Sequence, residues 1–171
     1  MNEAARHCTT AGTTSSFTVT VRDTMGQIAT GYTGTIYFSS SDVQAGLPVG
    51  YTFSAADAGV HTFVATLKTA GIQSISARDL TSALTGTAAG ITVSAAAFSK
   101  LVLSVPNGAD SKGHMLVTAG ESIMLTVRAT DAFSNNIAGY KGKVKFTSGG
   151  GTSGGGTGGG GGTGGGGGKK V

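Results

Sequence analysis

The chain of 171 residues contains 31 glycines, no tryptophan and only 12% charged residues. Its formal net charge of +4 is not concentrated in a basic cluster, which argues against a nucleic-acid-binding surface. Cys8 is the single cysteine, so an internal disulfide and a metal site built from several cysteines are excluded. No apolar run approaches the roughly 20 residues that span a bilayer, and the opening MNEAARHCTT shows no apolar segment of a signal peptide.

Alternation of apolar and polar residues dominates residues 11–95. In SFTVTVRD, for example, Phe17, Val19 and Val21 point one way and the threonines between them point the other. Such runs predict strands near 15–23, 33–40, 50–54, 59–68, 71–79 and 89–95, and no segment holds a helical period. Many short strands bounded by turn residues are typical of an antiparallel β-sandwich. We expect its core to contain Phe17, Val19, Val21, Ile36, Phe38, Phe53, Ile75, Ile91 and Val93.

Further strands are predicted near 99–105, 122–130 and 142–148. Lys141, Lys143 and Lys145 alternate along the last of these, and we interpret them as a solvated face or as charges that guard an exposed strand from pairing. From 149 to 168 the chain is almost entirely glycine, interrupted only by threonine and serine. Such a segment cannot bury apolar surface and is predicted to be a flexible tail.

Residues 11–40 recur at 119–148 without a gap, so that Ala11 aligns with Ala119. Ten of the thirty positions are identical, among them the pairs Asp23/Asp131 and Tyr32/Tyr140. A repeat of this length is a sign of tandem duplication, in which each copy is one structural unit.

The segments AGTTSSFTVTVRDTMGQIATGYTGTIYFSSSD, YTFSAADAGVHTFVATLKTAGIQSISARD and GITVSAAAFSKLVLS resemble the tandem bacterial Ig-like repeats of large surface proteins. These repeats are similar to those of invasin- and intimin-type adhesins and, more distantly, to filamin-type Ig repeats. The resemblance implies an Ig-like antiparallel β-sandwich and a location on the cell surface or outside the cell. It also implies neighbouring Ig-like repeats as partners.

On this basis we expect three regions. Residues 1–96 form one repeat with a poor or missing first strand, residues 97–148 form the N-terminal part of a second, truncated repeat, and residues 149–171 form the glycine-rich tail. Three strands cannot cover their own apolar face. The second repeat is therefore expected to be loosely ordered, to lean on the first, or to exchange strands with another chain, which would give strand-exchange self-association.

Acidic residues offer the sharpest hypothesis for a ligand site. Calcium at a repeat junction would draw oxygens from Asp23, Asp42, Asp57 or Asp79, but it needs about 6–8 converging oxygens, and the chain has no D-x-D or EF-hand spacing. The alternative is that these residues are structural. Asp23 and Asp131 follow strands directly, where an aspartate fixes a turn by accepting hydrogen bonds from the backbone two residues on.

Other residues give little support for chemistry. His61 lies in an alternating strand, where packing is the simplest role, and His7 and His114 lie in weakly patterned segments. Tyr32 and Tyr140 are expected to pack at turns with their hydroxyls reaching the backbone, and sugar stacking is the alternative. We find no paired histidine or carboxylate motif, no G-x-S-x-G elbow and no phosphate loop.

The sequence therefore predicts no catalytic, cofactor-binding or metal residues, and no cofactor. The leading hypothesis is a non-catalytic spacer or adhesive stalk of a bacterial surface or secreted protein. The alternative is a carbohydrate- or protein-binding accessory module of an extracellular enzyme, with an extracellular protein or glycan as its partner. Neither a nucleic-acid partner nor a membrane span is expected.

Overall fold

The computed structural model describes residues 7–104, 118, 120 and 122–147. These residues form nine strands and a single 3₁₀ turn, Ala55–Asp57, with no α-helix among them. The chain therefore has the all-β class predicted from its alternating pattern. None of the described helical structure is long and apolar enough to cross a membrane. The predicted tail at 149–171 lies outside the described residues.

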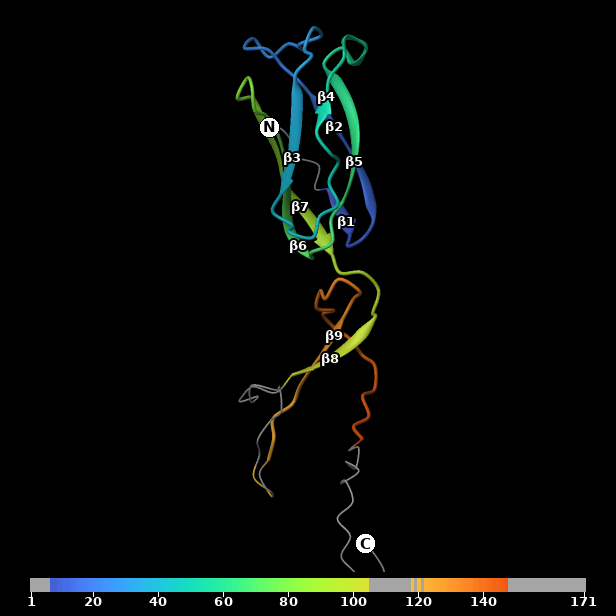
Figure 1. Cartoon of the computed structure of the whole chain (residues 1–171). Helices are drawn as coiled ribbons and strands as arrows, with labels where there is room; N and C mark the ends of the chain where they lie inside the picture. Colours follow the sequence, from blue (N-terminus) through green and yellow to red (C-terminus); the bar gives the residue numbers. More distant parts are fainter. Residues whose placement is uncertain (1–6, 105–117, 119, 121, 148–171) are drawn as a thin grey trace, which may run out of the picture. The chain divides into compact units, whose positions relative to one another are not determined.

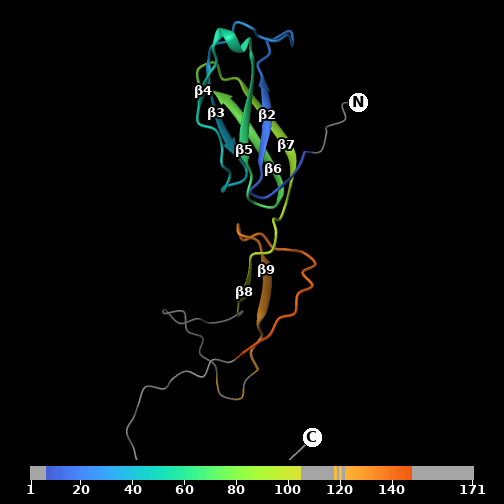
Figure 2. The same ribbon diagram turned by 90° about the vertical axis from the view of Figure 1, so that its right-hand side faces the viewer.

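Seven strands form a sandwich-like pair of sheets (Figures 1 and 2). One sheet has the order β1-β7-β6-β3-β4, and the other consists of β2 and β5. Their bounds are β1 Cys8–Thr10, β2 Thr14–Thr20, β3 Thr35–Ser40, β4 Tyr51–Thr52, β5 Val60–Thr66, β6 Gly71–Asp79 and β7 Thr85–Ser94. All pairings are antiparallel except that of β1 with β7, which is parallel.

The core lies between these two sheets. Three phenylalanines from different strands meet there: Phe38 packs edge-on against Phe17 and Phe63, with ring centroids 5.6 and 4.8 Å apart. One buried cluster is formed by Ile36, Phe53 and Phe63, and the other by Ala11, Ala65, Leu67, Ile75 and Val93.

Some of the predicted core residues are fully buried and the others are only partly buried. Of the nine predicted residues, Ile36, Phe53, Ile75 and Val93 are buried, whereas Phe17, Val19, Val21, Phe38 and Ile91 are half-buried and pack against the two clusters. The prediction left out the inward face of β5, where Phe63 and Ala65 are buried.

Two further strands, β8 Lys100–Ser104 and β9 Thr126–Thr130, pair antiparallel as a two-stranded sheet. Leu101 lies opposite Ala129 and Leu103 opposite Val127. Both strands lie within the same compact unit as the sandwich, Met1–Tyr140.

The strand predicted near 142–148 is not formed in residues 141–147. Lys141, Lys143 and Lys145 are exposed there, but they do not line one face of a strand. The repeat gives the reason: the equivalent strand β3 is held between β4 and β6. In the described part of the second repeat, no strand takes the place of β4 or β6. A strand without a ladder partner leaves its backbone groups unpaired, so the prediction was wrong.

Candidate functional site

The turn that begins at Asp131 is built around its own carboxylate. Asp131 Oδ1 accepts hydrogen bonds from the backbone N–H of Phe133 at 2.9 Å and of Asn135 at 2.8 Å. The backbone closes the turn, because Asp131 N–H donates to Asn135 O and Ser134 N–H donates to Asp131 O. Ser134 has a φ of 71°, the left-handed conformation that such a turn needs.

The first repeat contains the same turn at the aligned position, Asp23. Asp23 Oδ1 accepts from the N–H of Met25 at 2.9 Å and of Gln27 at 2.8 Å, and Gly26 has a φ of 81° at the position of Ser134. The interpretation of Asp23 and Asp131 as turn-fixing residues is therefore confirmed. The two turns differ in their surroundings, and the sequence did not indicate this difference.

The second turn is hydrogen-bonded to the first repeat. The side chain of Asn135 accepts from Ala70 N–H at 2.8 Å and donates to Lys68 O at 2.7 Å. Asp131 Oδ2 accepts from Ala96 N–H at 2.9 Å and from Asn135 Nδ2 at 2.8 Å. Asp131 is 0% exposed and Asn135 8% exposed. We call this set, residues 131–135 with Gly12, Lys68, Ala70 and Ala96, the junction.

Phe133 supplies the apolar part of the junction. It packs against the buried cluster that contains Ala11 and Leu67. Its ring also lies over Gly12, where an added Cβ would come within 2.5 Å of two ring atoms. Gly12 has a φ of 82° and donates its N–H to Leu67 O. At this position glycine meets two demands at once, the left-handed backbone and the space for the ring.

The hydrogen bonds at the junction favour an ionised Asp131. Burial acts to raise the pKa of this carboxyl, but the side chain of Asn135 and the N–H groups of Ala96, Asn135 and Phe133 all donate to it, and the resulting pKa lies below the ordinary value. The carboxylate therefore holds the turn and the first repeat together as an anion whose oxygens are hydrogen-bonded to protein donors.

The four aspartates considered as alternative calcium ligands are not gathered at one site. Asp42 accepts hydrogen bonds from the backbone N–H groups of Gln44, Lys68 and Thr69, and Asp79 accepts them from Thr81 and Ser82. Across the described residues, no three His, Cys, Asp or Glu side chains are grouped so that they could hold a metal ion.

Asp57 and His61 form a separate small network with Tyr51. His61 Nδ1 lies 2.7 Å from Asp57 Oδ1, and its ring stacks on Tyr51 at 4.1 Å between centroids. Hydrogen bonds from the N–H and hydroxyl of Ser54, and then from His61, hold the pKa of Asp57 well below its usual range. His61 therefore packs within its strand, as the alternating pattern predicted, and it also bonds to Asp57, which the sequence did not predict.

Both tyrosines pack against aromatic rings, as predicted, but the backbone partner predicted for the Tyr32 hydroxyl was wrong. The hydroxyl of Tyr32 does not reach the backbone but donates to Asp79 Oδ2 at 2.6 Å. Burial, followed by this bond to a carboxylate, raises the pKa of Tyr32. Tyr140 stacks on Phe98 with centroids 4.8 Å apart. His7 lies immediately before β1, and His114 lies outside the described residues.

Comparison with known proteins adds little. No family model matches the chain, and no curated protein matches it. A solved structure described as "Structure of the S-layer protein SbsC, domains 5-6" is similar over 78% of this chain, at 19% identity and a TM-score of 0.35. The match spans 62% of that chain's length.

Proposed function

We propose that the chain is a non-catalytic structural segment of a bacterial cell-surface or secreted protein, in which sandwich repeats are joined end to end as a spacer or adhesive stalk. The surface location rests on the resemblance of residues 11–148 to tandem bacterial Ig-like repeats. The mechanical role rests on the junction, which is the observation that carries the proposal.

A spacer must transmit orientation from one repeat to the next. A flexible linker between repeats leaves their relative orientation free, whereas a buried, hydrogen-bonded contact restricts it. Asn135 bonds both to the N–H of Ala70 and to the carbonyl of Lys68 and is almost wholly buried. Side chains that bridge two backbone segments in this way favour a single mutual arrangement.

The turn at Asp23 extends the argument to a further repeat. It has the conformation of the Asp131 turn but is exposed, and Met25 at the position of Phe133 is 81% exposed. The Asp23 turn is therefore shaped to dock on the end of a preceding repeat, as the Asp131 turn docks on this one. The neighbouring Ig-like repeat is accordingly the partner we propose for this end of the sandwich.

Residual dipolar couplings measure the orientation of the two repeats directly. We expect couplings from residues 7–94 and from residues 126–137 to fit one alignment tensor. They should need two tensors once Asp131→Ala and Asn135→Ala are combined. The matched control is Asp23→Ala with Gln27→Ala in the exposed turn, which should keep one tensor. Two tensors in the unaltered chain would refute the spacer. Saturable binding on a glycan array would favour the accessory-module alternative.

A further inference from the structure

Strand β2 has one edge with no strand partner in the described part of the chain. Along its whole length β2 pairs with β5, from Thr14 opposite Thr66 to Thr20 opposite Val60. Its counterpart in the second repeat is β9, and β9 is paired with β8. β2 and β9 correspond in sequence. β8 pairs with one edge of β9, but the same edge of β2 has no strand beside it.

The backbone shows which groups this edge presents. Val21 N–H donates to Gly59 O, so the odd-numbered residues of the segment bond toward β5. Backbone groups alternate along an antiparallel strand, so those of Thr18, Thr20 and Arg22 face the free edge. At the equivalent of Arg22, the carbonyl of Thr130 accepts from Ser99 N–H, beside β8. The free edge of β2 therefore presents the same arrangement of backbone N–H and C=O groups that β9 presents to β8.

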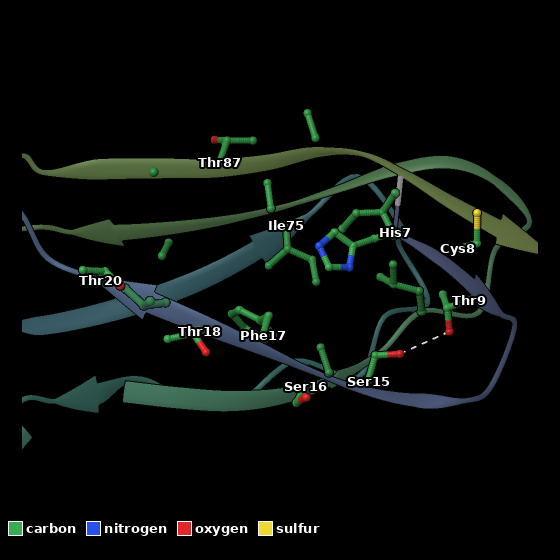
Figure 3. Close-up of a pocket in the computed structure, with 18 residues that line it drawn as sticks. His7, Cys8, Thr9, Ser15, Ser16, Phe17, Thr18, Thr20, Ile75 and Thr87 are labelled. Atoms are coloured by element: carbon green, nitrogen blue, oxygen red, sulfur yellow. Dashed lines mark hydrogen bonds between the residues drawn. The ribbon is translucent and has the colours of Figure 1, made fainter. Parts of the chain in front are cut away.

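An apolar groove lies beside this edge. A cavity of about 390 Å³ is bounded by β1, by β2 and by small or apolar residues of β6 and β7, among them Ala77, Gly86 and Ala88. Figure 3 shows Phe17 and Ile75 pointing into it, with the His7 ring beside Ile75. A second cavity of about 240 Å³ continues along β2 and shares Val19 and Gly86 with the first.

The inward side chains of β2 are less buried than those of its partner β5, which agrees with an opening beside β2. On β5 the inward residues Phe63 and Ala65 are 7% and 5% exposed. On β2 the inward residues Phe17 and Val19 are only half-buried. The sandwich is thus open beside β2, where one more strand would close it.

Strand β8 has the side chains that this opening requires. Leu101 and Leu103 lie two residues apart, so both face one side of the strand. On β9 they are poorly covered, because the sheet has two strands and Leu103 remains 54% exposed. Moved to β2 in the same register, Leu103 would lie opposite Val19 and Leu101 opposite Val21, with both side chains directed into the groove.

We propose that the groove along β2 receives strand β8 from a second copy of this chain. In this exchange β8 leaves β9 and pairs antiparallel with β2, with Val102 opposite Thr20 on the outer face. Each copy carries one donor strand and one receiving groove. Association is therefore either a reciprocal pair or an open series of copies. This inference goes beyond the spacer function, which depends on the junction and not on the groove.

A disulfide trap tests the register. In a Cys8→Ser background, one chain carries Thr20→Cys and the other Val102→Cys, so that a disulfide forms only between molecules. Directly opposed residues of a hydrogen-bonded pair have Cα atoms about 5.5 Å apart, within disulfide range. We expect the mixed disulfide to form at least about tenfold faster than with Ser16→Cys, an exposed site on the same strand out of register. Equal rates at the two sites would overturn the proposal.

Complementation provides a second measurement, by sedimentation velocity on the full chain. Leu101→Asp with Leu103→Asp removes the donor, and Ala88→Glu places a charge in the receiving groove at an exposed position. We expect each variant alone to be monomeric and their mixture to form a one-to-one dimer, while the unaltered chain associates as its concentration rises. A chain that stays monomeric at millimolar concentration, or a mixture that does not dimerise, would overturn the proposal.

Discussion

The turns at Asp23 and Asp131 have the same backbone and opposite environments. Each carboxylate accepts two N–H groups of its own turn at 2.8 and 2.9 Å. Asp131 is wholly buried and accepts a further bond from Ala96, whereas Asp23 is exposed. Local sequence therefore determines the conformation of the turn, and the neighbour that it meets determines whether the turn is a surface loop or a buried joint.

Removing the two carboxylates gives the largest expected contrast. Asp131→Ala leaves the N–H groups of Ala96, Phe133 and Asn135 without their acceptor, and a buried donor left unpaired costs about 1–3 kcal/mol. We expect a loss of roughly 3 kcal/mol or more in the free energy of unfolding, since several donors are affected. In Asp23→Ala, water can replace the lost acceptor, and the loss should stay below about 1 kcal/mol. Urea titrations followed by circular dichroism compare the two, and equal losses would show that burial at the junction contributes nothing.

Two glycines isolate the contact with Phe133. Gly12 and Gly120 have φ values of 82° and 91°, so alanine at either site meets the left-handed penalty of about 1–2 kcal/mol. Only at Gly12 would the new Cβ meet the Phe133 ring, while at Gly120 it meets nothing within 4 Å. Overpacking of this kind costs roughly 1–3 kcal/mol. Gly12→Ala should therefore be about 2 kcal/mol more destabilising than Gly120→Ala in the same urea titration.

The control for the glycine pair is a double variant. Combining Gly12→Ala with Phe133→Ala removes the clash and should bring the loss at Gly12 close to that of Gly120→Ala, relative to Phe133→Ala alone. If the extra cost persists without the ring, the contact with Phe133 is not its cause.

The fold was more predictable than the junction because the two depend on different ranges of the chain. The alternation that predicted strands β3, β5 and β6 is local, and each prediction agrees closely with the strand that forms. Strand β1 was missed: its sequence, CTT, carries no apolar alternation, and its parallel pairing with β7 depends on a distant part of the chain. The first four residues of β7, TGTA, were missed for the same reason, because they owe their strand form to pairing with β6.

The junction could be predicted only in part. The repeat identified Asp131 and the aspartate-turn rule gave its local bonds, but Asn135 contacts Lys68 and Ala70, which lie far from it in the sequence. The sequence holds one signal for a covered turn, the large apolar residue Phe133 inside it. This signal does not identify the surface that Phe133 covers.

The two apolar tips provide a smaller contrast. Phe133 is half-buried against the cluster of Ala11 and Leu67, whereas Met25, its counterpart, is 81% exposed. We expect Phe133→Ala to cost about 1–2 kcal/mol, part of the value for a fully buried apolar side chain. Met25→Ala should change the stability by less than about 0.5 kcal/mol, as exposed substitutions usually do. A Met25→Ala loss as large as that of Phe133→Ala would mean that the Asp23 turn is also covered in solution.

Acid titration gives the smallest expected effect, a change in slope. Burial acts to raise the pKa of Asp131 in the folded chain, but the hydrogen bonds that its carboxylate accepts outweigh burial and leave the pKa below its ordinary value. The stability it contributes is therefore present above the unfolded pKa of about 4 and is lost as the pH falls below that value toward the folded pKa. Asp42, Asp57 and Asp79 are shifted in the same direction, so the unaltered chain should lose stability steeply below about pH 4. Asp131→Asn takes up no proton in this range, and its free energy of unfolding should fall less steeply between about pH 4 and pH 2. Urea titrations at several pH values measure both slopes, and parallel slopes would show that Asp131 does not gain from ionisation at the junction.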